Sequence, residues 1–559
     1  MVASVRRLLV VVLATTTVAV ISPLRPPTPA LAAPASQRVY MVTDSVGLGA
    51  KDAVPAAFPP DWQVTVDGTP ALFVEQLESK HVRTRMASDP GVFGDYAIVA
   101  GGYNYPFWDP PRFDRSIDSI IAAFEEAGVK QVFWVTLREV KPEYISASAW
   151  IQVQPYYWYF PTVNEHLRAA VSRHPDLSLI DWAAIADRPG LTYDAIHLNT
   201  AGQADYAANI ARVVMSAASR LPAGSTTTVK VAGVGGVPAD DTAVSLNLTV
   251  TNPRTPGFLT AYPCDEPRPL ASNVNFKSDN TVAGAAIVPV APDGTVCVYT
   301  SAATHVIVDV MGSFSGTDGY IRAGPVRLTD TRDLGDGGLL AHNPLRVQLP
   351  QSVAGGAAIL NVTAVSGPQP GFVTVYRCGD PIPATSNVNF PPSGVVPNLV
   401  IAQADASGGV CLFANQPTHL VVDLFGGLAA NAVSVQSPVR AIDTRLSGGR
   451  PPAQSVVSAA TRALAGTMGV LVNLTTTQPD NSGFLTAYPC DENRPPTSNL
   501  NVVAQQTVAN FATVRPDAAG NICVFTQSSA HVIVDVTGTI GSAYSGLAVP
   551  SRAFDSRGA

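Results

Sequence analysis

A serine, an aspartate and a histidine in the first part of the chain have the types and spacing needed for ester chemistry. Ser45 follows an apolar stretch, and the small residues after it predict a turn into a helix that exposes its hydroxyl. Asp194 stands three positions before His197, which lets a carboxylate hold the imidazole through Nδ1 while Nε2 stays free. Such an imidazole can take the proton of a serine hydroxyl, which then attacks a carbonyl carbon. These residues therefore predict nucleophilic acyl chemistry.

Two further residues are placed to stabilise the negative charge that such an attack creates. Gly68 ends a predicted strand over 63–66, and Asn104 lies just past a predicted strand over 95–99. A backbone N–H and a side-chain amide could both donate to an oxyanion. Taken singly, an Asp-Ser pair, an Asp-x-x-His segment or a glycine at a strand end is more typical of turns and caps. Their occurrence in order on one frame of strands and helices favours catalysis.

Residues 38–219 supply that frame. Sequence patterns predict strands over 39–42, 63–66, 95–99, 131–135 and 177–180, and helices over 117–127, 163–173 and 202–217. Strands that alternate with helices predict a parallel sheet covered on both faces. Chemistry in such sheets collects beyond the carboxyl ends of the strands. We therefore expect Ser45, Asp194 and His197 to meet at one rim of this domain.

The same residues resemble the four sequence blocks of the SGNH or GDSL-like hydrolase family, over about a third of the chain. The matching blocks are Asp44-Ser45, Gly68, Gly102-Tyr103-Asn104 and Asp194-Ala195-Ile196-His197. Residues 44–50 and 180–182 are similar in particular to the extracellular catalytic domain of peptidoglycan O-acetyltransferases. Two positions depart from the pattern: Thr43 stands where the family has Gly, and Tyr105 stands where many members have Asp or His.

The resemblance implies a fold and a set of roles. The fold is an α/β three-layer sandwich with a flavodoxin-like parallel sheet. The roles are Ser45 as nucleophile, His197 as base and Asp194 as the residue that orients the base. Ser45, Gly68 and Asn104 are implied as oxyanion donors. Neither a cofactor nor a metal is expected.

These inferences predict a secreted serine esterase that removes acyl groups, foremost acetyl, from a cell-envelope glycan or related carbohydrate through an acyl-enzyme. Transfer of the acyl group to a glycan hydroxyl is the nearest alternative, because the second half-reaction needs only a nucleophile other than water. That alternative requires a separate acyl donor. A different alternative is a non-catalytic envelope-binding protein or adhesin whose first domain has lost activity.

Composition and charge bear on partners and location. Only 14% of the 559 residues are charged and the net charge is −7, which disfavours nucleic acid as a partner. Arg6 and Arg7, an apolar run over 8–21 and the small residues at 30–32 predict a cleaved signal peptide over 1–33. The apolar run is shorter than the ~20 residues that span a bilayer. We expect a secreted or cell-surface protein with no transmembrane segment in its mature form; the oligomeric state stays open.

A threefold repeat occupies the second part of the chain. Three cysteine pairs, each with partners 33 positions apart, recur along it: Cys264 and Cys297, Cys378 and Cys411, Cys490 and Cys523. In an exported protein this pattern predicts one disulfide per repeat, and the lack of a Cys-x-x-Cys segment argues against zinc. Alternating β-branched residues and a composition of 47 Pro and 44 Gly predict short strands with no convincing helix.

We expect a hydrolase domain over 38–219, a linker over 220–228, and β repeats over 229–341, 342–453 and 454–559. Each repeat carries copies of three segments, which in the first repeat are Gly-Phe-Leu-Thr-Ala-Tyr-Pro-Cys at 257–264, Ser-Asn-Val-Asn at 272–275 and Val-Asp at 308–309. By these segments the repeats resemble a unit that is common in secreted and cell-surface proteins of actinobacteria. Their expected role is binding or positioning at the cell envelope, and a structural spacer is the alternative.

A motif at the end of each repeat indicates that the repeats close on one another. Its three copies are Arg327, Asp330 and Arg332, then Arg440, Asp443 and Arg445, then Arg552, Asp555 and Arg557. If each motif packs against the repeat that follows, the last copy has no follower and the first repeat has no predecessor. Ring closure removes this mismatch and protects strand edges. We therefore predict a closed pseudo-threefold β assembly, with three separate sandwiches in a row as the alternative.

Two other features have packing interpretations. The aromatic cluster 156–160, before the predicted helix that starts at 163, could offer a platform for sugar rings but is more typical of packing. His305, His419 and His531 each lie in a strand pattern. A hydrogen-bonded structural histidine is more common there than a metal ligand.

Overall fold

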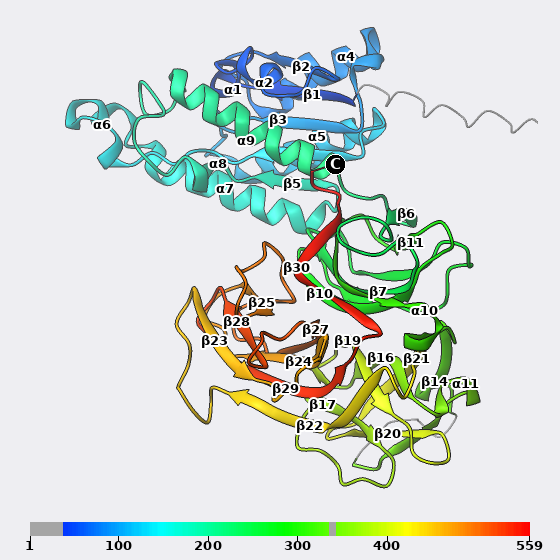
Figure 1. The fold of residues 1–559 in the computed structure, drawn as a ribbon. Coiled ribbons are helices and arrows are strands. Elements are labelled where there is room, and N and C mark those ends of the chain that lie inside the picture. The colour runs from blue at the N-terminus through cyan, green and yellow to red at the C-terminus, as the bar shows by residue number, and fades with distance from the viewer. Residues whose placement is uncertain (1–36, 335–341, 559) are drawn as a thin grey trace, which may run out of the picture. The chain divides into compact units, whose positions relative to one another are not determined.

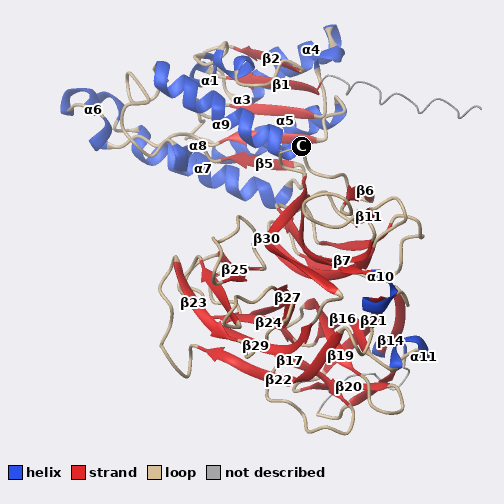
Figure 2. Cartoon of the chain, in the orientation of Figure 1, coloured by secondary structure: helices blue, strands red, loops and turns tan. Residues whose placement is uncertain are grey.

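The computed structural model describes residues 37–334 and 342–558. The chain forms two compact units, unit 1 over Met1–Met215 and unit 2 over Ser216–Ala559. The predicted signal peptide, residues 1–33, lies outside the described residues. Figure 2 shows helices and strands mixed in unit 1 and strands almost throughout unit 2. Within the described ranges no helix combines the length and apolar character of a membrane span.

Unit 1 is built on a five-stranded parallel sheet, as the alternation of strands and helices predicts. Its order is β2 (Trp62–Gly68), β1 (Gln37–Thr43), β3 (Tyr96–Ala100), β4 (Gln131–Val135) and β5 (Leu177–Ile180), and all neighbouring pairs are parallel (Figure 1). The chain runs from β1 to β2 on one side and places β3 on the other, so the strand order reverses between β1 and β3. Open α/β sheets bind ligands beyond the carboxyl ends of their strands at such a point.

Helices cover both faces of this sheet. They are α1 (Ser45–Leu48), α2 (Ala53–Ala56), α3 (Val74–Leu77), α4 (Arg83–Ser88), α5 (Pro110–Glu126), α6 (Ala147–Val153), α7 (Tyr156–Arg173), α8 (Trp182–Ile185) and α9 (Thr200–Ala218). Successive residues of a strand point to opposite faces, and Tyr40 and Met41 of β1 are both fully buried. Tyr40 shares a core with Phe124 of α5 and Leu167 of α7.

Helix α7 begins at Tyr156 and not at the predicted position 163, so the aromatic cluster 156–160 forms its first turns. Pro161 lies inside the helix and removes one backbone donor, which is why the sequence pattern places the helix start after it. Tyr159 and Phe160 are buried in the core, whereas Trp158 is exposed. The packing interpretation therefore covers only part of the cluster.

Unit 2 forms six sheets over its described residues, which corrects the expectation of three units because each sequence repeat contributes two sheets. In the first pair, one sheet has the strand order β6 (Ser225–Lys230), β11 (Thr295–Thr300), β8 (Gly257–Pro263), β9 (Val274–Phe276). The other sheet has the order β10 (Val282–Pro289), β7 (Asp241–Thr251), β12 (His305–Ser315), β30 (Tyr544–Asp555). In the second pair, one sheet has the strand order β15 (Leu345–Gln348), β20 (Gly409–Ala414), β17 (Gly371–Arg377), β18 (Val388–Phe390). The other sheet has the order β13 (Tyr320–Ile321), β21 (Thr418–Leu428), β16 (Ala357–Ser366), β19 (Val395–Gln403), and β14 (Val326–Asp330) also pairs with β21. In the third pair, one sheet has the strand order β23 (Ser455–Ala460), β28 (Asn521–Thr526), β25 (Gly483–Pro489), β26 (Leu500–Val502). The other sheet has the order β22 (Val433–Asp443), β29 (His531–Ile540), β24 (Gly469–Thr477), β27 (Val508–Val514).

Two local expectations for unit 2 need correction. Strand β6 begins at Ser225, inside the segment 220–228 that the sequence predicts as a linker. Its small polar residues pair with β11 along the edge of a sheet, where polar side chains face solvent, so composition alone gives no strand signal. Two four-residue helices, α10 (Gly316–Gly319) and α11 (Gln351–Ala354), also interrupt the strands.

The end of each repeat completes a sheet of another repeat, and the last one closes the ring. Strand β14 pairs with β21, β22 with β29, and β30 with β12 of the first repeat (Figure 1). This pairing confirms the closed assembly and excludes a row of separate sandwiches. Each motif contributes an arginine that bonds an aspartate buried in the receiving sheet: Arg327 to Asp423, Arg440 to Asp535 and Arg552 to Asp309.

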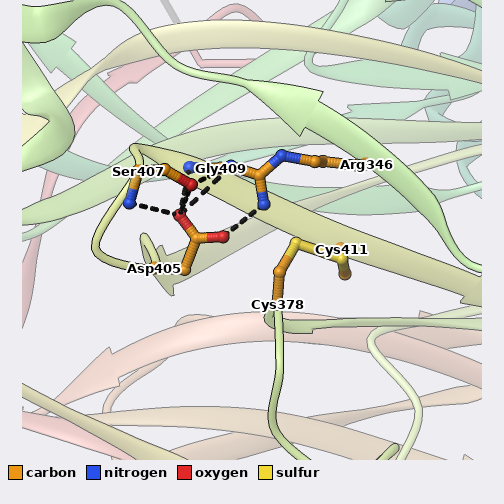
Figure 3. The surroundings of a disulfide bond; sticks show 6 residues. All are labelled: Arg346, Cys378, Asp405, Ser407, Gly409 and Cys411. Carbon is orange, nitrogen blue, oxygen red and sulfur yellow. Dashed lines mark hydrogen bonds and ion pairs between the residues drawn. A yellow bond between two sulfur atoms is a disulfide. The ribbon is translucent and has the colours of Figure 1, made fainter.

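The three repeats also share histidine contacts and disulfides. His305, His419 and His531 each place Nδ1 within 3.2–3.3 Å of a hydroxyl from the motif of another repeat, on Ser556, Thr331 and Thr444. The disulfides are Cys264–Cys297, Cys378–Cys411 and Cys490–Cys523, as the spacing predicts. Figure 3 shows the second one beside Arg346 and Asp405, an ion pair that ties β15 to the turn before β20. Disulfides fit an oxidising compartment.

Candidate active site

Ser45 lies where β1 turns into α1, at the point of the sheet where the strand order reverses. Asp44 caps this short helix by accepting the backbone N–H of Val46 at 3.1 Å. The turn is tight, because a Cβ at Gly47 would lie 2.2 Å from the hydroxyl oxygen of Thr43. Thr43, one of the two departures from the SGNH pattern that the sequence resembles, donates its hydroxyl to the carbonyl of Ala100 at 2.9 Å and so ties β1 to β3.

The structure brings Ser45, His197 and Asp194 together in a line of hydrogen bonds. His197 Nε2 lies 3.1 Å from Ser45 Oγ, across 152 positions of sequence, and His197 Nδ1 lies 2.7 Å from Asp194 Oδ2. The other oxygen of Asp194 accepts the backbone N–H of Ile196 at 3.0 Å and of His197 at 2.6 Å. Burial raises the pKa of Asp194, but these hydrogen bonds outweigh it and hold the pKa below its ordinary value. The carboxylate is therefore ionised and can stabilise an imidazolium.

Gly68 ends β2 directly beside the end of β1, where it is in register with Thr43. A Cβ at Gly68 would lie 2.4 Å from the carbonyl oxygen of Thr43. Only glycine fits this close approach, so the residue does more than end a strand.

Asn104 lies in the segment that follows β3, and its Nδ2 is buried without a hydrogen-bond partner among the described residues. A buried amide donor without an acceptor is costly, by about 1–3 kcal/mol. This nitrogen keeps its capacity to donate a hydrogen bond to an acceptor.

The segment that carries Asn104 is anchored on both sides of it. On one side, the N–H of Tyr103 donates to Asp44 Oδ2 at 3.2 Å. On the other, Tyr159 of α7 accepts the N–H of Tyr105 at 2.7 Å and donates its hydroxyl to the carbonyl of Tyr105. The hydroxyl of Tyr105 in turn lies 3.2 Å from His166 Nε2. Tyr105, the second departure from the family pattern, is thus a buried support of the segment.

Asp44 makes a structural connection that the sequence motif alone does not indicate. Its carboxyl is fully buried and joins the turn after β1 to the segment after β3, through Val46 and Tyr103. Burial raises its pKa to about 7, against the effect of the backbone N–H groups and of nearby His197. Sequence reasoning missed this bridge because the Asp-Ser pair marks Asp44 only as a cap.

Arg138 is a second residue that the sequence did not mark. It follows β4, is buried, and donates to three carbonyl oxygens of the segment that precedes and includes Ala195. These partners lie 48 to 57 positions away in the chain. No local sequence pattern predicts contacts over such a separation.

Exposed aromatic side chains gather near the same edge of the sheet. Tyr193 is 72% exposed, and its ring lies parallel to that of His197 at 5.9 Å between centroids. Phe107 and Trp108, three and four positions beyond Asn104, are 55% and 60% exposed and contact each other edge to face. Phe107 also contacts Trp158 of α7. Tyr193 therefore presents an exposed ring next to His197, and Phe107, Trp108 and Trp158 form an exposed cluster after the segment that carries Asn104. Within the described part of the chain no cluster of three or more His, Cys, Asp or Glu residues suits a metal.

No family model and no curated protein sequence matches this chain. Solved structures resemble about a third of it. The C-terminal catalytic domain of Streptococcus pneumoniae peptidoglycan O-acetyltransferase A shares 18% identity over 32% of this chain and 94% of that chain, with a TM-score of 0.26. A GDSL-like lipase from Bacteroides thetaiotaomicron shares 11% identity over 33% and 89%, with a TM-score of 0.27. An acetyl xylan esterase shares 15% identity over 32% and 99%, with a TM-score of 0.25.

Proposed function

We propose that unit 1 is a secreted serine esterase of the SGNH type that works through an acyl-enzyme on Ser45. The observation that carries the proposal is the line of atoms from Ser45 Oγ to His197 Nε2, at 3.1 Å, and from His197 Nδ1 to Asp194 Oδ2, at 2.7 Å. A general base must lie within about 2.6–3.2 Å of the group whose proton it takes. Both distances meet this requirement.

In the first half-reaction, Ser45 Oγ attacks the carbonyl carbon of the ester while His197 Nε2 takes the hydroxyl proton. Asp194, ionised and bonded to Nδ1, stabilises the imidazolium that forms. The C–O bond then breaks, and His197 returns the proton to the departing alcohol. In the second half-reaction, His197 takes a proton from water, which attacks the carbonyl carbon of the acyl-enzyme. The bond from that carbon to Ser45 Oγ then breaks, the acid leaves, and His197 returns the proton to Ser45 Oγ.

The backbone N–H groups of Ser45 and Gly68 and the amide of Asn104 are the proposed oxyanion donors. The unpartnered Nδ2 of Asn104 supports this role, because the amide has no acceptor to give up when the oxyanion forms. The close approach of Gly68 to Thr43 supports it also, because a side chain at this position would displace the end of β2 from the end of β1.

The proposed substrate is an acylated carbohydrate, with acetyl as the foremost acyl group and a cell-envelope glycan as the foremost source. The exposed rings of Tyr193, Phe107 and Trp108 support a carbohydrate, because pyranose rings can lie against flat aromatic faces. The three disulfides support export, since such bonds persist in oxidising compartments.

Labelling with a fluorophosphonate tests the proposed nucleophile without knowledge of the natural substrate. We expect one adduct per chain, on the peptide that contains Ser45, and none in Ser45→Ala. Ser172→Ala is the matched control, because Ser172 is an exposed helix residue whose hydroxyl bonds only its own helix. An adduct on a different residue, or no adduct on a folded protein, would refute the assignment of Ser45.

A further inference from the structure

A buried arginine lies behind the turn that carries Asp194 and His197. Arg138 is 2% exposed, yet its guanidinium bonds to main-chain carbonyls and not to a carboxylate. Nη1 donates to Ala195 at 3.1 Å, Nε to Ala186 at 2.9 Å and Nη2 to Arg188 at 2.9 Å. Three bonds from one planar group fix the path of the whole segment relative to β4.

Burying this guanidinium costs more free energy than filling the same space with an apolar side chain. A buried cation loses its hydration, and neutral carbonyls compensate for that less than a carboxylate would. Accordingly, burial lowers the pKa of Arg138. An apolar side chain of similar length would fill the same space at a lower cost, so the contacts to the carbonyls need a further reason.

The reason lies in the backbone of Ala195, which has a φ of +72°. This left-handed conformation is unfavourable for a residue with a Cβ, and it stands between Asp194 and His197. The carbonyl of Ala195 and the N–H of Ile196 belong to one planar trans peptide and point in opposite directions. When Arg138 holds that carbonyl, the N–H is aimed away from Arg138, and it donates to Asp194 Oδ1 at 3.0 Å.

We infer that Arg138 is a positioning residue that holds the turn 194–197 in the conformation in which Asp194 and His197 face Ser45. The inference rests on the proposed function for its catalytic consequence, whereas the geometry it explains is independent of any substrate. Arg138 bonds none of the three side chains and acts through the peptide between Ala195 and Ile196.

Arg138 also reaches the segment that carries Asn104. Its backbone N–H donates to the hydroxyl of Tyr103 at 3.1 Å, and the backbone N–H of Tyr103 donates to Asp44. One residue therefore joins the acid–base turn to the proposed oxyanion segment. A displacement of Arg138 would disturb both.

Substitution of Arg138 tests the inference on the full chain. In Arg138→Met, which keeps the length and removes the donors, we expect kcat on an aryl acetate to fall by about 100-fold with KM within about threefold, because a displacement of about 1 Å costs this much. In Arg138→Lys, whose side chain can donate to only some of the three carbonyls, kcat should fall less. This variant is used in place of Arg138→Met if Arg138→Met does not fold. Arg115→Met is the matched control, because Arg115 is exposed and pairs only at the surface with Asp109; it should keep its activity.

A second substitution separates positioning from general support of the core. Glycine adopts a positive φ without the Cβ penalty, so Ala195→Gly should restore at least tenfold of the lost kcat in the Arg138→Met background. Ala195→Gly alone sets the reference for this comparison. If the double variant is as slow as Arg138→Met, the turn is not the route by which Arg138 acts, and the inference is wrong.

A readout without turnover keeps this test distinct from the proposed function. The Nδ1–H of His197, hydrogen-bonded to Asp194, gives a low-field proton resonance, which ¹⁵N-histidine labelling and His197→Ala assign. We expect the resonance in the wild-type chain, its loss in Arg138→Met and its return in the double variant. This pattern in a protein without esterase activity would reject the proposed function and uphold the positioning role. An unchanged resonance in Arg138→Met would overturn the positioning role even if the protein is an esterase.

Discussion

Removal of the Asn104 amide should slow catalysis without weakening the fold. In Asn104→Ala the oxyanion loses one donor, which lowers kcat by about 10² to 10³, equivalent to about 2.7–4 kcal/mol of transition-state stabilisation. The free protein loses nothing comparable, because Asn104 Nδ2 has no partner among the described residues. Removal of a buried unpaired amide can even stabilise the fold by about 1 kcal/mol.

Two measurements on the same variant test this reasoning. Hydrolysis of an aryl acetate gives kcat and KM, and we expect KM within about threefold of the wild-type value. The stability of unit 1 can be followed by tryptophan fluorescence, because all six tryptophans of the chain lie before residue 216. Urea unfolding should show a midpoint equal to or above that of the wild type.

The opposite pattern would refute the reasoning. If Asn104→Ala kept its kcat, the amide would not serve the transition state. If the variant lost activity together with a large fall in the unfolding midpoint, Asn104 would be a structural residue with a partner in the native protein. Asn104→Asp, which places a carboxylate oxygen where the amide nitrogen stood, should be slower still than the alanine variant.

Three further predictions follow from other contacts. Tyr159→Phe removes the acceptor of the Tyr105 N–H, so kcat should fall about tenfold, whereas the exposed Tyr157→Phe on the same helix should not differ from the wild type. Burial raises the pKa of Asp44 from 3.8 to about 7, so between these pH values the folded protein keeps a proton that the unfolded chain releases. The stability of unit 1 should therefore fall as pH rises from about 4 to about 7. A pH series of urea midpoints should show this decline in the wild type and its loss in Asp44→Asn. Arg552→Ala leaves Asp309 buried without its partner in the closing strand, so calorimetry should show that unit 2 is destabilised by about 2 kcal/mol. Arg557→Ala is the control, because the side chain of Arg557 is half-exposed.

The sheet of unit 1 could be predicted closely because its strands are short apolar runs separated by helical patterns. The predicted β4 and β5 agree with the structure to the residue, and the others differ by a few positions at their ends. A parallel sheet then dictates that residues after β1 and before α9 share one edge. The meeting of Ser45 with His197 follows from this topology.

Contacts between distant segments could not be predicted. Arg138 binds carbonyls, which carry no side-chain signature, and Asp44 receives the N–H of Tyr103 from 59 positions away. The sequence pattern places the start of α7 too late, because Pro161 is a helix breaker in sequence but is tolerated where the first turns pack on the core. In unit 2 the repeat motif predicts closure, yet the division of each repeat into two sheets depends on pairing that periodicity does not reveal.

Direct detection of the acyl-enzyme tests the central claim. The full chain is mixed with an excess of an aryl acetate, quenched in acid within the first turnovers, digested and analysed by mass spectrometry, with Ser45→Ala treated in parallel. We expect a burst of the aryl alcohol equal to one per chain and a single acetyl group on the peptide that holds Ser45, with neither in the variant. Turnover that persists in Ser45→Ala, or an acetyl group found on another side chain, would contradict the account.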